Sequence, residues 1–316
     1  MTGGVRRVVA LDADAEHAAR LRDPGLALDD LGAERTVFVD AVTDASRLDG
    51  RFDFALVTLK APRLADALSP LAEAGRVDSY VSLGNGLVQE RIGELVGHDR
   101  LVVGTVEWGA TNLGPGHVAQ TTAGFFVVGE PDGAERERTR RLAQVLGTVA
   151  DVRVTDNVLG QVWSKLLVNS TFSGLGAVSG LLYREVAAHP AGRRVTGPLW
   201  AEGVAVAHAS GVELAEVIGV RPEALAARDP DDRAGADEAI DALMGTVGAT
   251  KSSMLQDLER GATTEVDVIN GGVVDRGGAV GVPTPLNGRV AALVHAIERG
   301  EREPSPAALD ELAAEA

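Results

Sequence analysis

The pattern of hydrophobic and polar positions changes about halfway along the chain. In the first half, short runs rich in Val, Leu and Phe alternate with Ala-rich segments whose apolar residues recur at helical spacing. The predicted strands are residues 7–11, 36–42, 54–59, 80–83, 101–106, 125–128 and 152–154, and the predicted helices include residues 15–21, 63–71 and 134–146. Apolar strands alternating with helices are typical of a parallel, doubly wound sheet. We therefore predict a Rossmann-like α/β domain over residues 1–155, with an antiparallel pair around the Gly-Pro-Gly turn in 112–116.

The second half of the chain has a different pattern. From residue 156 the β-rich runs stop, and apolar residues follow helical periodicity to about residue 300. This predicts an all-α domain over residues 156–300. Residues 301–316 are charged and interrupted by proline, so we expect a flexible tail there.

Composition narrows the classes of function. The formal charge of -16 argues against a nucleic-acid partner, although a small anionic substrate needs only one or two local cations. There is no cysteine, and the six histidines are scattered without metal-ligand spacing, so we expect no metal site. No apolar run approaches the roughly 20 residues that span a bilayer, and no signal-peptide pattern begins the sequence. We expect a cytoplasmic protein with no membrane association.

A polar stripe interrupts one of the most apolar helical segments, residues 163–175. Lys165, Asn169 and Ser173 recur at i, i+4 and i+8 and therefore share one face of a predicted helix. The stripe could face solvent. Because the rest of the helix is apolar and therefore largely buried, it could equally line a cleft.

A second polar group lies in residues 251–287. Thr264 is predicted to begin a helix as its N-cap, with Asp267 in the position of the capping-box acid. Gly281, followed by two prolines, is predicted to end that helix.

Several short motifs in these segments resemble the ketopantoate reductase family. The helix VWSKLLVNS is similar to the family pattern W-x-K-L-x-x-N, and SSMLQD is similar to its substrate-binding serine motif. The resemblance implies that Lys165 is the catalytic proton donor and also contacts the substrate. It further implies that Asn169 and Ser253 bind the substrate, a small 2-oxo acid, and that the helical domain binds substrate and can form a homodimer.

The same resemblance extends to the cofactor, which would be NADP or NAD. The segment TEVDVING is similar to the family's T-E-I-D-x-x-N-G, and VTLKA and SLGNGL are similar to two motifs of its first domain. The implied cofactor-binding residues are Lys60, Asn85 and Glu265. In the implied reaction, an ammonium group beside the ketone stabilises the developing alkoxide and delivers a proton.

Three positions depart from the family pattern in the expected substrate pocket. Ser173, Tyr183 and Thr250 each stand where the family commonly has an asparagine. The departures leave reductase chemistry in place but put ketopantoate itself in question as the substrate. Loss of one substrate hydrogen bond can cost about 1–3 kcal/mol.

The largest departure concerns the glycine-rich fingerprint G-x-G-x-x-G, which this sequence does not contain. The pattern begins near what would be the second strand of a dinucleotide-binding sheet. The strand that normally precedes the fingerprint is central, so we expect its two neighbours to lack a partner. At the end of residues 7–11, Asp12 and Asp14 suit the ribose hydroxyls of NAD better than the 2′-phosphate of NADP; Asp12 could equally be a helix N-cap.

Two functional hypotheses follow. The first is an NAD(P)H-dependent reductase of a small 2-oxo acid, favoured by the joint presence of Lys60, Asn85, Lys165, Ser253 and Glu265. The second is a non-catalytic relative that has lost dinucleotide binding and acts as a binding or dimerisation module, favoured by the missing fingerprint.

Overall fold

The computed structural model describes residues 4–226 and 233–316. By their internal contacts the residues divide into two compact units. The α/β unit comprises residues 1–84 and 89–158, and the helical unit comprises residues 85–88 and 159–316. The division lies close to residue 155, where the sequence pattern changes.

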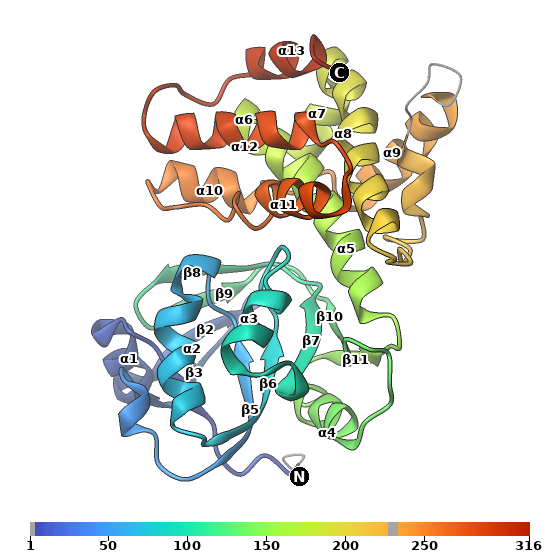
Figure 1. Cartoon of the computed structure of the whole chain (residues 1–316). Coiled ribbons are helices and arrows are strands. Elements are labelled where there is room, and N and C mark those ends of the chain that lie inside the picture. The colour runs from blue at the N-terminus through green and yellow to red at the C-terminus, as the bar shows by residue number, and fades with distance from the viewer. Residues whose placement is uncertain (1–3, 227–232) are drawn as a thin grey trace. The chain divides into compact units, whose positions relative to one another are not determined.

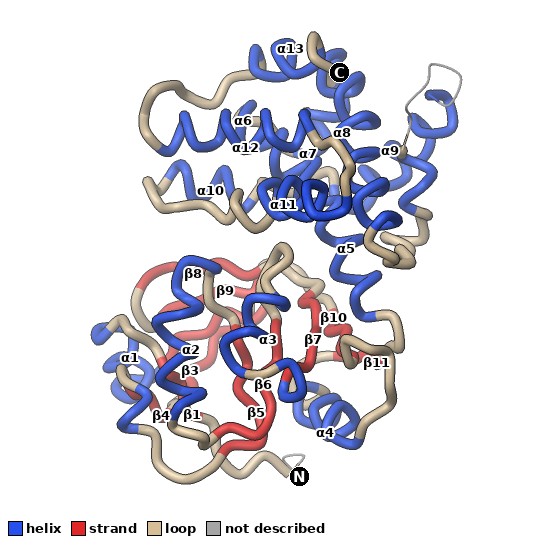
Figure 2. Tube along the Cα trace, in the orientation of Figure 1, coloured by secondary structure: helices blue, strands red, loops and turns tan. Residues whose placement is uncertain are grey.

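The strands of the α/β unit form three sheets in the described part of the chain (Figures 1 and 2). One has the order β11-β10-β7-β6-β5, a second has the order β3-β2-β9-β8, and β1 pairs with β4. The strands are β1 (Val9–Leu11), β2 (Leu26–Asp30), β3 (Ala33–Val37), β4 (Asp40–Val42), β5 (Phe52–Val57), β6 (Val77–Ser82), β7 (Leu101–Val106), β8 (Ala110–Gly114), β9 (His117–Gln120), β10 (Phe125–Gly129) and β11 (Asp151–Val154).

The five-stranded sheet gives the unit its Rossmann-like character and confirms the predicted fold class. β5, β6 and β7 run parallel, whereas β10 runs antiparallel to β7 and parallel to β11. The sequence LVVGTV of β7 is buried at all but its last position, as expected for a central strand that is covered on both faces. β8 and β9 form the antiparallel pair that the Gly-Pro-Gly turn predicts.

The predicted strand 36–42 is wrong, because these residues belong to two strands of different sheets. β3 ends at Val37 and β4 begins at Asp40, and between them Phe38 is exposed. The backbone amide of Val39 donates to the carbonyl of Leu21, which turns the chain from one sheet to the other. An apolar run cannot reveal such a turn when no glycine or proline marks it.

The sheet of the α/β unit is interrupted between β1 and β5. In residues 4–226 and 233–316, neither strand has a second partner on its other edge. Val8 beside β1 is 62% exposed and Leu56 in β5 is 45% exposed, although parallel strands are normally covered on both faces. The Arg7 side chain connects the beginnings of the two strands, since it donates to the carbonyl of Asp49 at 2.8 Å and lies 5.7 Å from the centre of the Phe52 ring. This arrangement agrees with the expectation that two neighbouring strands would lack a partner.

Four α-helices accompany these strands in the described residues of the α/β unit. They are α1 (Ala15–Arg20), α2 (Leu64–Glu73), α3 (Gln89–Val96) and α4 (Glu137–Leu146). α3 packs on β6 and β7, and α4 packs on β10 and β11. Leu142 and Leu146 of α4 are buried against Phe126 and Val128 of β10, so this helix closes the hydrophobic core at that end of the sheet.

The helical unit contains the remaining helices of the described chain. They are α5 (Val158–Val168), α6 (Gly174–Ser179), α7 (Tyr183–Ala188), α8 (Pro190–Ala209), α9 (Arg233–Val247), α10 (Ser253–Glu259), α11 (Asn270–Val280), α12 (Pro285–Glu298) and α13 (Ala307–Ala313). A π-helical turn, η5 (Asn169–Ser173), connects α5 to α6. Gly281 ends α11 in a left-handed conformation, φ 72°, which confirms the predicted stop.

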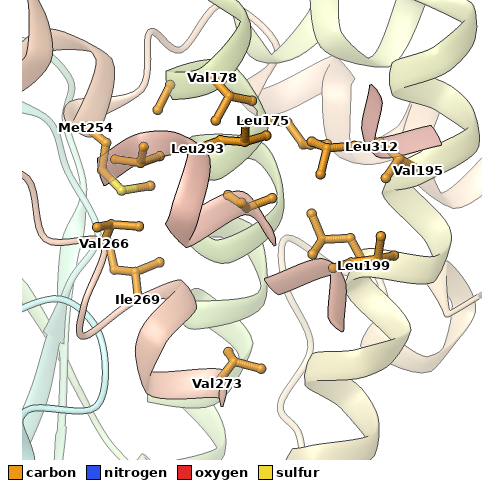
Figure 3. Packing of buried hydrophobic residues seen from close by; sticks show 14 of the residues in the cluster. Leu175, Val178, Val195, Leu199, Met254, Val266, Ile269, Val273, Leu293 and Leu312 are labelled. Carbon is orange, nitrogen blue, oxygen red and sulfur yellow. The ribbon is translucent and has the colours of Figure 1, made fainter. Parts of the chain in front are cut away.

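The helical unit has two buried hydrophobic clusters in its described residues, one of which includes Phe172 and Trp200. The other is the large hydrophobic core shown in Figure 3. Side chains from α6, α8, α10, α12 and α13 meet in it, together with Val266 and Ile269 from the segment before α11. The C-terminal segment 301–316, expected to be a flexible tail, instead contains α13, whose Leu309 and Leu312 are buried in this core. In AALDELA, Ala308, Leu309 and Leu312 recur at helical spacing, and this pattern could have predicted the helix.

None of the helices in the described ranges combines the length and the apolar character that crossing a bilayer requires.

Candidate functional site

The polar stripe of residues 163–175 is divided by a change of helix type. Lys165 lies in α5 and is partly exposed, and Asn169 is the first residue of η5 and is also partly exposed. Ser173, the last residue of η5, is buried. The wider π-helical turn shifts the residues that follow it, so Ser173 does not continue the exposed stripe. Lys165 and Asn169 therefore share a partly exposed face, one turn apart.

The π-helical turn also connects the segments that carry the other candidate residues. In a π-helical turn some backbone carbonyl groups lack their usual α-helical donor and can accept hydrogen bonds from side chains instead. The Ser252 hydroxyl donates to the carbonyl of Ser173 at 2.9 Å, and the Asn270 amide donates to the carbonyl of Ser170 at 2.8 Å. The beginnings of α10 and α11 are thereby fixed to the helix that carries Lys165.

Ser253 is the first residue of α10 and is exposed. Its neighbour Ser252 is the N-cap, whose hydroxyl accepts from the backbone amide of Leu255 at 3.3 Å. The same Ser252 hydroxyl donates to Ser173. Of the two serines in this motif, Ser252 fixes the helix, and Ser253 is presented at its positively polarised end.

Asn85 and Glu265, two of the residues implied to bind the cofactor, contact each other directly. The Asn85 side-chain amide donates to the Glu265 carboxylate at 3.0 Å, and both residues are partly exposed. Beside them the backbone amide of Leu87 donates to the carbonyl of Val268 at 3.1 Å. Gly86 permits this close approach, since a Cβ atom there would lie 2.2 Å from the Val268 oxygen. The 85–88 loop thus packs on the segment that presents Glu265.

Thr264 is not the N-cap of a helix, so that prediction is wrong. α11 begins at Asn270, and residues 264–269 form turns in which the Thr264 hydroxyl accepts from the amide of Val266 at 3.2 Å. Asp267 contacts His295 rather than closing a capping box. Thr264 and Glu265 therefore lie in a short loop that precedes α11.

The three departures from the family pattern are connected to one another. The Ser173 hydroxyl and the Tyr183 hydroxyl are 2.5 Å apart, and both side chains are buried. Burial raises the pKa of Tyr183, although the hydrogen bond with Ser173 opposes the shift. The backbone amide of Tyr183 donates to the carbonyl of Thr250 at 3.2 Å. Ser173 and Tyr183 thus use their hydroxyl groups for each other.

A buried polar network, which was not predicted from the sequence, joins the helices next to these segments. Glu202 in α8 accepts from the backbone amides of Leu286 and Asn287 at 2.8 and 2.9 Å, and from the Asn287 side chain at 2.8 Å. Asn287 in turn accepts from Asn270 at 3.0 Å. The network caps the beginning of α12 and joins it to α11. The available signal was a glutamate inside the otherwise apolar run of residues 199–207 in α8.

Two further candidates lie in the α/β unit, each after the carboxyl end of a strand. Asp12 follows β1 and is partly exposed; its carboxylate accepts from the amide of Asp14 at 2.9 Å. Asp14, not Asp12, is the N-cap of α1, since it accepts from the amides of Glu16 and His17. Lys60 follows β5 and is exposed. Ligands of open α/β sheets bind at the carboxyl ends of strands, which keeps both residues as candidates.

Comparison with known proteins identifies relatives over most of the chain. Residues 3–133 match the family model described as ketopantoate reductase PanE/ApbA, and residues 157–298 match the model of its C-terminal domain. The 2-dehydropantoate 2-reductase of Halobacterium salinarum is 30% identical over 302 residues, which cover 95% of this chain and 93% of the relative.

Solved structures of similar fold also cover most of the chain. The crystal structure of a PanE/ApbA family ketopantoate reductase from Ralstonia eutropha has a TM-score of 0.78 and 28% identity, covering 95% of this chain and 92% of that chain. D-mandelate dehydrogenase, in a ternary structure with NADH and anilino(oxo)acetate, has a TM-score of 0.78 at 24% identity, covering 94% of this chain and 92% of that chain. The second likeness is one of fold alone.

Proposed function

This chain belongs to the ketopantoate reductase family, a family of NAD(P)-dependent oxidoreductases, and on that premise we propose that it reduces the ketone of a small 2-oxo acid with NADH or NADPH. The observation that carries the proposal is the connection of three segments in the helical unit. η5 follows the helix of Lys165, and its carbonyls hold the N-cap before Ser253 and the first residue of α11, just after the loop of Glu265.

In this proposal Lys165 supplies the acid. The bound cofactor would supply hydride to the carbonyl carbon, which leaves negative charge on the oxygen. The Lys165 ammonium group beside that oxygen stabilises the charge and transfers a proton to it, a contribution of typically about 10²–10⁴-fold in rate. Asn169, one turn away, and Ser253, at the beginning of α10, donate hydrogen bonds to the oxygens of the substrate.

The residues of this chain fit a nicotinamide cofactor in part. Asn85 and Glu265 are polar, partly exposed and mutually bonded, and Asp12 has a second carboxylate oxygen available for ribose hydroxyls. Lys60 adds a cation after β5. The pyrophosphate would need backbone amides at a helix N-terminus, and the sequence has no G-x-G-x-x-G to supply them. We propose NADH as the preferred cofactor, on account of Asp12.

The substrate need not be ketopantoate. Ser173 and Tyr183 stand where asparagines are expected, and their hydroxyl groups are bonded to each other in a buried position. A pocket with fewer available hydrogen-bonding groups gives less advantage to a hydroxylated substrate. We therefore propose that 3,3-dimethyl-2-oxobutanoate, which lacks only the 4-hydroxyl of ketopantoate, is reduced with a kcat/KM at least equal to that of ketopantoate.

The alternative of a non-catalytic relative is favoured by the interrupted sheet between β1 and β5. Titration of the protein with NADH and with NADPH, followed by nicotinamide fluorescence, decides between the two. The reductase proposal predicts saturable binding of at least one cofactor, and its oxidation when either 2-oxo acid is added. If neither cofactor binds below millimolar concentration, the protein is not a reductase and the alternative holds.

A further inference from the structure

The imidazole of His295 in α12 lies between two carboxylates. Its Nε2 atom is 2.9 Å from an oxygen of Asp267, and its Nδ1 atom is 2.8 Å from an oxygen of Glu298. The Asp267 side chain comes from the loop before α11, whereas Glu298 is one turn along α12. The histidine thus bridges a helix and a loop.

This geometry determines the protonation state of the ring. An ionised carboxylate can only accept hydrogen bonds, and a neutral imidazole has one donor and one acceptor nitrogen. If both nitrogens face carboxylates, both must donate, so the ring is an imidazolium. Burial lowers the pKa of His295, but the nearby Glu298 and Asp267 carboxylates outweigh it, and the pKa lies above its usual value.

The other charges near the ring do not change this picture. Asp267 and Glu298 are its two ion-pair partners, and Arg299, the C-cap residue after α12, is paired with Glu301. Within the described residues, no group of three histidine or acidic side chains could hold a metal ion.

Both carboxylates are attached to the short loop that presents Glu265. The second oxygen of Glu298 accepts from the backbone amide of Thr264 at 2.8 Å, and Thr264 is only 3% exposed. Asp267 is two residues beyond Glu265 on the other side. The histidine therefore holds the loop at points on either side of Glu265, while Asn85 contacts Glu265 itself.

We propose that His295 is a positioning residue, which as an imidazolium joins Asp267 to Glu298 and so fixes the loop of residues 264–268 that presents Glu265. The effect on cofactor binding rests on the proposed function; the effect on the loop does not. Deprotonation leaves one ring nitrogen with a lone pair facing a carboxylate, which weakens one of the two attachments. The loop should loosen as the pH rises through the pKa of His295, and cofactor affinity should fall with it.

The loop can be tested without any cofactor. In NMR spectra of the whole protein recorded over a pH series, we expect the His295 ring to titrate above the usual value of 6.5. The amide signal of Thr264 should shift with the same midpoint. In His295→Gln that shift should be lost, whereas in His208→Gln it should remain. His208 is the matched control, because it contacts Glu223 at 3.1 Å but is not connected to the Glu265 loop. A ring that titrates at or below its usual value, or a Thr264 amide that does not follow it, overturns the proposal.

Cofactor affinity provides the second measurement. The Kd for NADH should rise about fivefold in the wild type as pH increases through the His295 midpoint, the loss of roughly one surface ion pair. His295→Gln should show the weaker affinity at every pH, and His295→Lys, which keeps a cation, should restore tight binding and abolish the pH dependence. If His295→Lys binds NADH as weakly as His295→Gln, a cation between Asp267 and Glu298 does not position the loop, and the proposal is contradicted. If no cofactor binds at all, the reductase proposal fails, and the NMR titration still decides the role of His295.

Discussion

The helical unit and the α/β unit differ in how completely their secondary structure is paired and covered. In the helical unit, the beginnings of α10, α11 and α12 are attached through Ser252, Asn270 and Glu202. In the α/β unit, the edges of β1 and β5 have no second partner among the described residues, and apolar side chains next to them are exposed. The contrast bears on two requirements of a reductase. In the proposed reaction, the proton donor and the substrate-binding residues lie in the helical unit. The proposed cofactor residues are divided between the helical unit, with Asn85 and Glu265, and the α/β unit, with Asp12 and Lys60.

The largest expected effect concerns a buried carboxylate that stabilises the α/β unit. Glu130 is 1% exposed; Arg138 donates to its carboxylate at 2.9 and 2.5 Å and Thr139 donates at 2.5 Å. Glu130→Ala leaves these donors without their acceptor and should destabilise the unit by about 3 kcal/mol. Glu135→Ala, at a carboxylate whose side chain is 88% exposed, is the control and should have almost no effect. Hydrogen exchange should locate the loss of stability in the α/β unit. If the amides of the helical unit lose protection equally, Glu130 does not stabilise the α/β unit specifically.

The same residue gives a pH dependence with a defined sign. Burial raises the pKa of Glu130, but hydrogen bonds from Arg138 and Thr139 outweigh it, and the pKa lies below its usual value. Its contribution to stability is therefore present above the unfolded-state value of 4.5 and is lost as pH falls through the lower folded-state value. In thermal unfolding, the Tm difference between wild type and Glu130→Ala should shrink as the solution is acidified below pH 4.5. A difference that grows on acidification would reverse the assigned sign.

The next effect tests whether the chemistry belongs to the helical unit. Lys165→Ala should lower kcat by roughly 10²-fold or more while leaving the Kd for NADH almost unchanged, because the ammonium group acts on the substrate oxygen. Lys251→Ala is the control in the same unit, since this exposed lysine pairs with Glu259 on the surface. Steady-state kinetics with 3,3-dimethyl-2-oxobutanoate measures kcat for both variants, and titration followed by nicotinamide fluorescence measures their Kd for NADH. Near-normal turnover of Lys165→Ala would remove this lysine from the role of proton donor.

Local patterns in the sequence were sufficient for much of the fold. Periodicity indicated the α/β and all-α halves and β7, and the glycine and prolines from Gly281 onward indicated the stop of α11, because each of these signals depends on neighbouring residues. Non-local contacts were not predictable in this way. The splitting of residues 36–42 between two sheets and the burial of α13 both depend on segments distant in the sequence.

The site shows the same limit. The motifs indicated Asn85 and Glu265 separately, but the contact between them joins residues 180 positions apart. Periodicity placed Ser173 on the stripe with Lys165, and the π-helical turn, which no local pattern signalled, removed it. The bond between Ser173 and Tyr183 changes the meaning of both departures, since two substitutions that look independent are physically coupled.

A smaller effect tests what the α/β unit contributes to the proposed nucleotide binding. Asp12→Asn should weaken NADH binding about fivefold, the loss of one charge-assisted hydrogen bond to a ribose hydroxyl, and should affect NADPH less. The substitution keeps an oxygen that accepts from the Asp14 amide, so the beginning of α1 should be preserved. Equal weakening of both cofactors would show that Asp12 shapes the turn without reading the ribose.

The smallest effect is also the most direct test of the interrupted sheet. Leu56 lies in β5 and is 45% exposed, so Leu56→Ser should change the free energy of unfolding by no more than about 0.5 kcal/mol. Val57→Ser, at the next position on the opposite, buried face, is the control and should cost several times more. If Leu56→Ser costs as much as Val57→Ser in denaturant unfolding, Leu56 is covered in solution. The apolar face of β5 would then be as well covered as the helical core, and exposure of this strand would no longer distinguish the two units.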